Sequence, residues 1–343
     1  MDYANQYRPQ TASDDECFLI SSLLKAEGAF LSGSALAKTL EVSRTAVCQK
    51  IKKLKADGFS IESSPRRGYR LTSVPDRLHP VLLRHAMGSN ELDFLFYPEI
   101  DSTNSEAERQ IANGREGSFA ILSGNQTMGR GRRGRAWFSA SPDNLYLTLT
   151  FEPQLPAVQL RHFTLWSGIL LCRMLQRHVP AKPLQIKWPN DLYCEGRKFA
   201  GMLTEARMEA DYLKTLFFGF GLNVNGSIRH FPEALRQKTT SLRLLTGEEL
   251  PLNTIAAESI QAIERAYQHC INDLDTNELK SAWAPLDFLS GHCVEAAGVG
   301  TRLTGTARGI DSSGALRIED SAGKIHLVHA GDVTLNPMDS SIS

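Results

Sequence analysis

Residues 129–135 hold four arginines and three glycines in seven positions, and this segment is the part of the chain best suited to chemistry. The whole chain has 38 basic (Lys and Arg) and 38 acidic residues, so the positive charge here is local. Like charges this close repel one another unless an anion neutralises them, and glycines let a backbone approach a ligand closely. The segment, called the Arg/Gly loop below, therefore predicts a loop that wraps a polyanion such as a nucleotide phosphate and stays loose until that anion arrives.

The Arg/Gly loop also fits the G-x-G-x-x-G pattern of dinucleotide-binding folds. That pattern needs an apolar strand before it and a helix after it. Residues 126–128 are not strand-like, and residues 136–142 do not begin a helix, so we reject this interpretation. A solvated basic loop without a ligand remains as the simpler alternative.

Two further polar segments follow predicted strands. Residues 101–104 (Asp-Ser-Thr-Asn) come after the apolar run 94–97, and they could cap a helix over 105–112 or bind a polar ligand. Lys187 and the turn 189–191 follow the end of another strand, which is where α/β sheets place ligands. A solvated turn lysine is the alternative for Lys187.

Two more segments, 197–205 and 217–225, are predicted as buried strands. Gly219 and Gly221 would lie on one face of the second strand. Their missing side chains leave room for a ligand, or simply for an opposing backbone.

The rest of the composition excludes several classes of chemistry. The six cysteines are far apart with no C-x-x-C, the nine histidines form no zinc-spaced pair, and no Gly-x-Ser-x-Gly elbow occurs. We therefore expect no metal held by the protein, no side-chain nucleophile, and reduced thiols typical of the cytoplasm. No apolar run approaches the ~18 residues of a membrane span, and the first residues do not resemble a signal peptide, so no membrane contact is expected.

The first part of the chain has the pattern of a winged helix. Helices are predicted over residues 14–25, 35–40 and 44–57, followed by two alternating strands at 59–62 and 68–71. In a helix–turn–helix, the start of the second helix of the pair enters the DNA major groove. Between Arg44 and Arg70 there are eight basic residues and two acidic ones, which is the charge excess expected at DNA.

The residues expected at DNA come from the third helix and from the turn between the strands. Three would read bases and the others would lie nearer to phosphates. They are Arg44, Thr45 and Gln49 at bases, with Ser43, Lys50, Lys52, Lys53, Arg66 and Arg67 beside them. Ser43 would also cap its helix. A three-helix interaction module with a solvated basic face is the alternative.

The polar segments occur in a recognisable order. They read Asp-Ser-Thr-Asn, Gln-x-x-Gly-Arg-Gly-Arg-x-Gly-Arg-x-Trp, Lys-Trp-Pro-Asn-Asp and Gly-x-Gly-x-Asn. In this order they resemble the motifs of the biotin–protein ligases. From about residue 14 to about residue 335, the chain resembles the two-function bacterial type, in which a ligase is fused to an N-terminal DNA-binding repressor domain.

The expected fold class is α+β multidomain. Residues 1–74 are predicted as a winged helix-turn-helix domain, with a linker near Pro75. The resemblance implies an α/β ligase domain over 75–288, with a mixed sheet like that of class II synthetases. Residues 289–343 show short alternating strands and turns, which predict an SH3-like β-barrel.

The resemblance implies a two-step reaction. Biotin and MgATP would give biotinyl-5′-AMP and pyrophosphate, and a lysine of a biotin carboxyl carrier protein would then take the biotin. Such chemistry needs cations and positioning rather than a protein nucleophile. The resemblance also implies that the adenylate-bound form is a homodimer that binds a biotin operator and represses biotin synthesis, and that Mg²⁺ arrives with ATP.

The resemblance implies a role for each matching residue. The catalytic pair would be Lys187, bridging the biotin carboxylate and the α-phosphate, and Arg132, retaining the adenylate. The biotin-binding set would be Ser102, Thr103, Asn104, Gln126, Arg130, Gly131, Arg132 and Lys187. The set for ATP or adenylate would be Arg132, Arg135, Trp137, Asn190, Asn223 and Arg308, with Asp191 beside them.

Two other functions share parts of this pattern. One is a transcription factor that senses biotin or its adenylate with a dead ligase site, and the other is a lipoyl-type ligase. The intact Arg/Gly loop and Lys187 argue against both.

Overall fold

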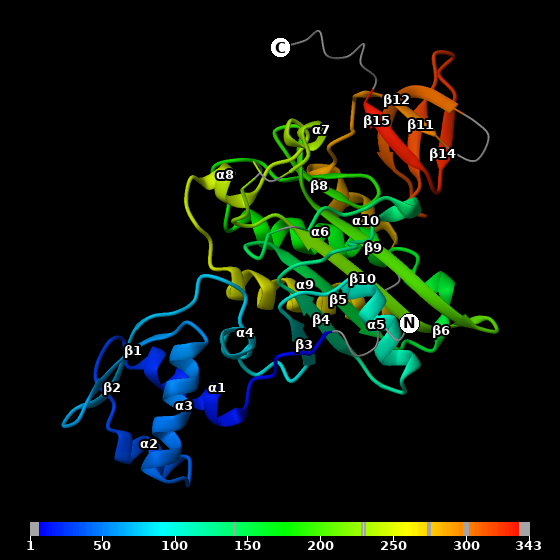
Figure 1. The fold of residues 1–343 in the computed structure, drawn as a ribbon. Coiled ribbons are helices and arrows are strands. Elements are labelled where there is room, and N and C mark those ends of the chain that lie inside the picture. The colour runs from blue at the N-terminus through cyan, green and yellow to red at the C-terminus, as the bar shows by residue number, and fades with distance from the viewer. Residues whose placement is uncertain are drawn as a thin grey trace.

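The computed structural model describes residues 7–139, 141–227, 229, 231–272, 276–297 and 302–335. The predicted domains 1–74 and 289–343 extend into 1–6, 298–301 and 336–343, which lie outside the described residues. Three parts follow one another along the molecule, with the two terminal parts at opposite ends of a central sheet (Figure 1).

The N-terminal part has three helices and a two-stranded antiparallel sheet. Its elements are α1 (Asp14–Lys25), α2 (Gly33–Thr39), α3 (Arg44–Ala56), β1 (Ser60–Ser64) and β2 (Gly68–Ser73). The predicted spans agree with these bounds to within a few residues. The expected cap of the third helix is present, since Ser43 Oγ accepts the Ala46 N–H at 3.1 Å.

Helix α4 (Pro80–Met87) joins the N-terminal part to the central one. Val81 and Leu82 complete the apolar core of the winged helix, whereas Leu83 and Met87 belong to the core of the central domain. Because one helix contributes to both cores, the segment after the predicted linker holds the winged helix against the central domain.

The central part is built on one mixed sheet in the order β3-β4-β5-β10-β9-β8-β7. Only the β3–β4 pair is parallel, as far as the described strands of this sheet are concerned. The strands are β3 (Asp93–Tyr97), β4 (Phe119–Ser123), β5 (Leu145–Phe151), β6 (Leu155–Pro156), β7 (Gln185–Lys187), β8 (Asp191–Cys194), β9 (Arg197–Glu209) and β10 (Tyr212–Leu222). The predicted mixed sheet is thus present.

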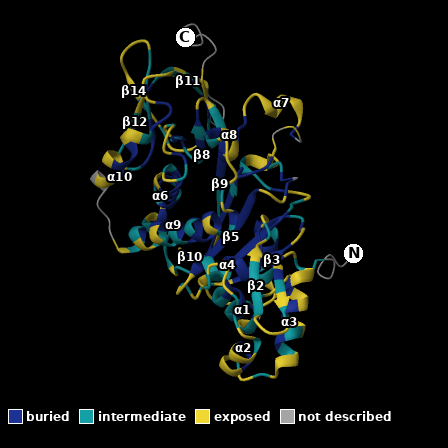
Figure 2. Cartoon of the chain, turned by 90° about the vertical axis from the view of Figure 1, so that its left-hand side faces the viewer, coloured by how far each residue is buried: buried dark blue, intermediate teal, exposed yellow. Residues whose placement is uncertain are grey.

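Helices cover both faces of this sheet, and its middle is buried (Figure 2). Helices α6 (Phe163–Gln176) and α9 (Leu252–Asn272) pack together on one face. Helix α5 (Thr103–Ala112) covers part of the other face, next to β4, β5 and β10. The shorter helices are α7 (Glu233–Arg236), α8 (Leu242–Thr246) and α10 (Thr276–Trp283), with 3₁₀ turns at Arg132–Gly134, Ala157–Leu160 and Ala284–Leu286.

The C-terminal part is a five-stranded antiparallel sheet in the order β14-β13-β12-β11-β15. Its strands are β11 (Cys293–Ala297), β12 (Arg302–Ile310), β13 (Leu316–Glu319), β14 (Ile325–Val328) and β15 (Asp332–Leu335). The indole of Trp188 donates to the Gly314 carbonyl at 3.0 Å, which ties this sheet to the turn after β7. Across the described residues, we find no helix with the length and apolar character that crossing a membrane requires.

Candidate functional site

The polar turn 101–104 lies at the start of α5 and is almost fully buried. Ser102, Thr103 and Asn104 are 2%, 3% and 4% exposed. Ser102 occupies the cap position but makes no capping hydrogen bond, so the expectation that the turn caps its own helix is corrected. Instead the Thr103 N–H donates to Gln126 Oε1 at 2.8 Å. The Thr103 hydroxyl donates to the same oxygen at 3.1 Å, so Gln126 holds the start of the helix from a neighbouring segment.

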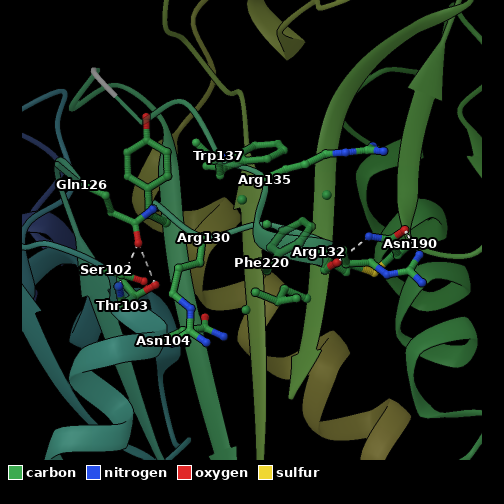
Figure 3. Close-up of a pocket in the computed structure, with 18 of the residues that line it drawn as sticks. Ser102, Thr103, Asn104, Gln126, Arg130, Arg132, Arg135, Trp137, Asn190 and Phe220 are labelled. Carbon is green, nitrogen blue, oxygen red and sulfur yellow. Dashed lines mark hydrogen bonds between the residues drawn. The ribbon is translucent and has the colours of Figure 1, made fainter. Parts of the chain in front are cut away.

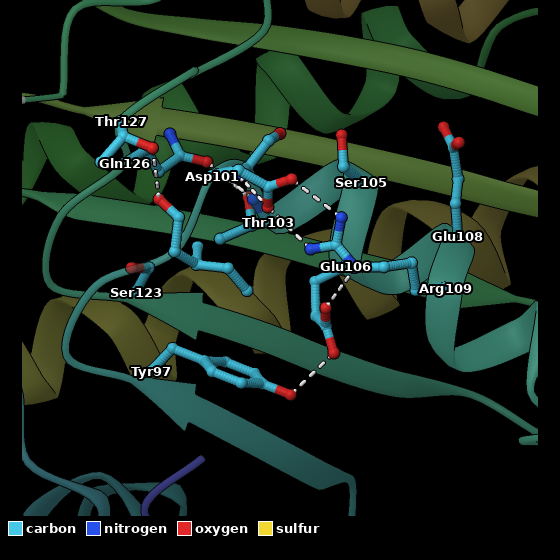
Figure 4. A network of polar contacts seen from close by, with 12 residues as sticks. Tyr97, Asp101, Thr103, Ser105, Glu106, Glu108, Arg109, Ser123, Gln126 and Thr127 are labelled. Carbon is cyan, nitrogen blue, oxygen red and sulfur yellow. Dashed lines mark hydrogen bonds and ion pairs between the residues drawn. The ribbon is translucent and has the colours of Figure 1, made fainter. Parts of the chain in front are cut away.

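Behind the turn, Arg109 of α5 holds Asp101 in place (Figure 4). Its two terminal nitrogens donate to the two carboxylate oxygens at 2.7 and 2.8 Å, and its Nε donates to Glu106 at 2.7 Å. Burial alone would raise the pKa of Asp101, but the hydrogen bonds and charge of Arg109 outweigh it and keep the pKa below its usual value. A forked, charged clamp of this kind fixes the turn rigidly.

The Arg/Gly loop forms a defined turn rather than a loose segment. The Gly131 N–H donates to the Arg135 carbonyl at 2.7 Å, and the Trp137 N–H donates to the Gly129 carbonyl at 2.8 Å. Arg133 takes a positive φ of 56°, a conformation that a non-glycine residue rarely adopts.

Carboxylates of the protein itself neutralise three of the four loop arginines. Arg130 lies 2.9 Å from Glu108 and 2.6 Å from Glu205. Arg133 and Arg135 both pair with Asp332 of β15. Carboxylates of the protein thus lie where an external anion was expected, with Arg133 and Arg135 sharing one of them. No local signal in the sequence pointed to these three acids, because they lie far from the loop along the chain.

Arg132 differs from the other loop arginines, because it makes no ion pair with any described residue. It donates only to Asn190 Oδ1, at 2.9 Å (Figure 3). Burial lowers the pKa of its guanidinium, which means that the cation is incompletely compensated where it lies. An anionic ligand would supply the missing charge.

One cavity collects residues from every polar segment (Figure 3). Of the predicted site residues, it is lined by Ser102, Thr103, Asn104, Gln126, Arg130, Gly131, Arg132, Arg135, Trp137, Asn190 and Asp191. Lys198 and Asp332, which the sequence did not single out, also line the cavity. The buried indole Nε1 of Trp137 has no hydrogen-bond partner among the described residues. A polar ligand in the cavity would satisfy such a donor.

Gly219 and Gly221 form the floor of the cavity, on one face of β10 as predicted. A Cβ on Gly219 would lie 2.4 Å from Asn104 Oδ1, and a Cβ on Gly221 would lie 2.4 Å from the Trp137 ring. The missing side chains of these glycines therefore make space for Asn104 and Trp137, rather than for a ligand directly as the sequence suggested.

Lys187 lies on the cavity face of the sheet but does not line the cavity. Residues paired across neighbouring strands lie on the same face of a sheet. Lys187 pairs with Asp191, Asp191 with Gly201, and Gly201 with Gly221, so Lys187 is on the face of Gly221. Burial lowers the pKa of the Lys187 ammonium. Lys198 does line the cavity, with its Nζ 2.7 Å from Asp191 Oδ1.

The structure does not bring Asn223 or Arg308 to the cavity. Asn223 is 1% exposed, and its amide donates to the Thr240 carbonyl at 3.1 Å, so it serves the packing behind β10. Arg308 lies on β12 and pairs with Glu319 at 2.5 Å. From the C-terminal part it is Asp332, not Arg308, that reaches the site.

No group of three or more His, Cys, Asp or Glu side chains that could hold a metal ion occurs among the described residues. Cys17, Cys48, Cys172, Cys194 and Cys270 are free thiols.

The winged helix presents one basic face. Arg44, Thr45 and Gln49 are exposed on α3, and Arg44 shares a surface hollow with Arg66 of the turn between β1 and β2. Arg67 lies over the ring of Phe30, with 4.1 Å from its guanidinium carbon to the ring centroid. Residues far apart in the sequence thus gather where a groove of DNA would lie.

Two lysines predicted near DNA phosphates are turned away from that face. Lys50 pairs with Asp15 at 2.9 Å, and Lys53 pairs with the buried Glu16 at 2.6 Å. Both acids lie in the first turn of α1, against which this side of α3 packs. We therefore correct the expectation for Lys50 and Lys53.

Comparison with protein families gives three matches. Residues 97–223 match the biotin/lipoate A/B protein ligase family, residues 18–70 match an HTH domain family, and residues 297–335 match the biotin protein ligase C-terminal domain. The fold class expected from the sequence is confirmed, with a helix–turn–helix domain, a ligase domain with a mixed sheet and a C-terminal antiparallel sheet.

Individual proteins match most of the chain. The chain is 31% identical over 315 residues to the bifunctional ligase/repressor BirA of Escherichia coli (strain K12), which covers 91% of this chain and 95% of the relative. It is 28% identical over 320 residues to the protein of the same name from Bacillus subtilis (strain 168), with coverage of 92% and 97%. Among solved structures, the biotin protein ligase from Aquifex aeolicus in complex with biotin and ATP matches with a TM-score of 0.61 and 26% identity. That match covers 71% of this chain and 99% of the other.

Proposed function

We propose that this chain attaches biotin to a carrier protein and represses transcription by binding DNA. The premise is that the chain belongs to the bifunctional ligase/repressor family of biotin protein ligases. The ligase activity is that of a biotin–[acetyl-CoA-carboxylase] ligase. One observation carries the proposal for the site: all four sequence motifs contribute residues to a single cavity.

The first step joins biotin to the nucleotide. The biotin carboxylate attacks the α-phosphorus of ATP, the bond to the β-phosphate oxygen breaks, and pyrophosphate leaves. The attacking group and the phosphates are all negative, so the residues must offset charge and align the two substrates. Arg132 is suited to this, because its charge is unpaired at the cavity wall. Mg²⁺ enters with the ATP and further offsets the phosphate charge.

The second step transfers biotin to the carrier. The amine of a carrier lysine attacks the acyl carbon of biotinyl-5′-AMP, an amide bond forms, and AMP leaves with the phosphate oxygen. We assign the biotin head to the buried turn of Ser102, Thr103 and Asn104 with Gln126, since these polar side chains meet at one end of the cavity (Figure 3). Arg130, Gly131, Arg132 and Arg135 would close over the carboxylate and phosphates.

A transfer assay tests the ligase. Purified protein, MgATP and labelled biotin are incubated with a biotin carboxyl carrier domain, and with a lipoyl domain as the control. We expect ATP-dependent label on the carrier domain alone. Tight biotin binding without transfer would instead favour a sensor with a dead ligase site, and label on the lipoyl domain would favour a lipoyl-type ligase.

The repressor function rests on the exposed basic face of the winged helix. We propose that binding of the adenylate favours a homodimer, because two winged helices related by a two-fold axis fit a two-fold operator. Sedimentation that finds only monomers with biotin and ATP present would refute this part. The compartment we propose is the cytoplasm, where thiols such as those of Cys172 and Cys194 stay reduced.

The DNA-binding face can be tested by removing two arginines. Arg44→Ala with Arg66→Ala should weaken binding to a mixed-sequence duplex, and should lower the slope of log affinity against log salt by roughly 1 for each lost phosphate contact. Lys214→Ala is the matched control, since it removes a cation from the β9–β10 hairpin, where Lys214 pairs with Glu209. Fluorescence anisotropy between about 50 and 200 mM salt measures both. Equal slopes for the double variant and the control would contradict the assignment.

A further inference from the structure

We propose that Glu205 is a positioning residue, which fixes the Asn104 amide and the Arg130 guanidinium at the same time and thereby sets the affinity for biotin. Glu205 belongs to β9 and does not line the cavity itself. The inference rests on the proposed function, because it concerns how the biotin site is held in shape.

Two donors from different parts of the chain meet at this carboxylate. Asn104 Nδ2 of α5 donates to Glu205 Oε2 at 2.8 Å. Arg130 Nη2 of the Arg/Gly loop donates to the other oxygen, Oε1, at 2.6 Å. Glu205 is therefore the point at which the polar turn and the Arg/Gly loop are joined, although Arg130 lies 75 residues before it in the chain.

An ionised carboxylate only accepts hydrogen bonds, and this decides how the Asn104 amide is turned. The amide must present its NH₂ group to Glu205, so its carbonyl oxygen points the other way. There Oδ1 accepts the Thr148 hydroxyl at 2.7 Å and lies over Gly219, part of the cavity wall. Glu205 thus decides which way the Asn104 amide faces, although Glu205 does not itself line the cavity.

Glutamine could not replace this carboxylate. Asn104 and Arg130 donate to different oxygens of Glu205, and glutamine would put an NH₂ group in place of one of these oxygens. The donor on that side would then face a second donor. Two donors converging on two separate oxygens require a carboxylate at this position.

The arrangement contributes little to stability. The Arg130 and Glu205 side chains are 35% and 30% exposed, and ion pairs this accessible contribute little to the free energy of unfolding. Arg130 is also held by Glu108 at 2.9 Å, so the loop keeps one anchor without Glu205. The expected consequence of losing Glu205 therefore lies in ligand affinity rather than in folding.

The test compares three glutamate-to-glutamine variants. Glu205→Gln should raise the KM for biotin and its dissociation constant by about tenfold, with kcat and the KM for ATP changed much less. Glu108→Gln removes a partner of Arg130 without touching Asn104, so the biotin KM should rise much less. Glu209→Gln lies on the same strand and pairs only with exposed Lys214, so its activity should match the wild type.

Further measurements separate positioning from a purely structural role. Glu205→Asp keeps both acceptor oxygens on a shorter side chain and should restore part of the biotin affinity. The thermal midpoint of Glu205→Gln should stay close to that of Glu209→Gln. A biotin KM for Glu205→Gln equal to that of Glu108→Gln would overturn the proposal, as would a fall in stability with equal losses for biotin and ATP.

The failure of this inference differs from the failure of the proposed function. If the wild-type protein forms no adenylate and transfers no biotin, the proposed function itself fails. If the wild type is active and Glu205→Gln binds biotin as tightly as it does, only the role of Glu205 is refuted.

Discussion

Replacing Lys187 with alanine is expected to slow adenylate formation by roughly 10²- to 10³-fold, because the role proposed for this lysine is to hold a fixed cation near the reacting phosphate. Among the described residues, the Lys187 ammonium makes no ion pair. Its Nζ lies over the Tyr193 ring, 5.3 Å from the ring centroid, in a cation–π contact. Its charge is therefore available to the substrates, on the same face of the sheet as the cavity.

Lys198→Ala is the matched comparison. Lys198 lines the cavity, but Asp191 already neutralises it at 2.7 Å. Its removal should therefore cost much less than the loss of Lys187. Pre-steady-state formation of labelled adenylate, measured without carrier, compares the two variants. A larger loss in Lys198→Ala would assign the electrostatic role to that lysine instead.

The pH dependence gives a second readout of Lys187. Burial lowers the pKa of this ammonium, and the cation is the form that offsets phosphate charge. As pH rises through the lowered pKa, the charge is lost and adenylate formation should fall, at a lower pH than an ordinary lysine would give. Lys187→Arg keeps its charge over this range and should flatten that alkaline fall.

Gly221→Ala is expected to weaken biotin binding by roughly 10- to 100-fold, in line with the 1–3 kcal/mol cost of overpacking a filled site. The new Cβ would lie 2.4–2.7 Å from three atoms of the Trp137 indole, where carbon atoms normally stay about 3.5–4.0 Å apart. Strand β10 is held between β5 and β9, so the indole must move and take the end of the Arg/Gly loop with it.

Gly168→Ala is the control for this glycine. It lies inside α6, and a Cβ there would first meet the flexible end of Met202 at 3.1 Å. Alanine also favours a helix interior by up to about 1 kcal/mol relative to glycine. Isothermal titration with biotin compares the two variants. Biotin binding by Gly221→Ala that equals that of Gly168→Ala would show that the indole does not need this space.

Local features of the sequence were sufficient to predict several elements of the fold, among them the helices and strands of the N-terminal part. The span of α1 and the cap of α3 at Ser43 follow from apolar spacing and capping chemistry, which act over a few residues. The shared face of Gly219 and Gly221 follows from the two-residue period of a strand. The ordered motifs predicted the family in the same way, because each motif is a short, local string.

The partners of the charged side chains could not be predicted from the sequence. Asp332 pairs with Arg135 across 197 residues, and Glu205 pairs with Arg130 across 75. Lys53 forms an ion pair with Glu16 of α1. At the start of α5, the Thr103 N–H donates to Gln126 rather than to a side chain of the polar turn. Each of these depends on which helix or strand packs beside another.

The sequence by itself thus determined which residue types are present, where helices and strands form, and which side chains share a face. Only the tertiary structure decided that Lys187 lies on the cavity face of the sheet without lining the cavity, and that Asn223 and Arg308 do not line it. The physical reason is one of range. Backbone propensity and side-chain period act between near neighbours, whereas the choice of charge partner is made when distant elements pack together.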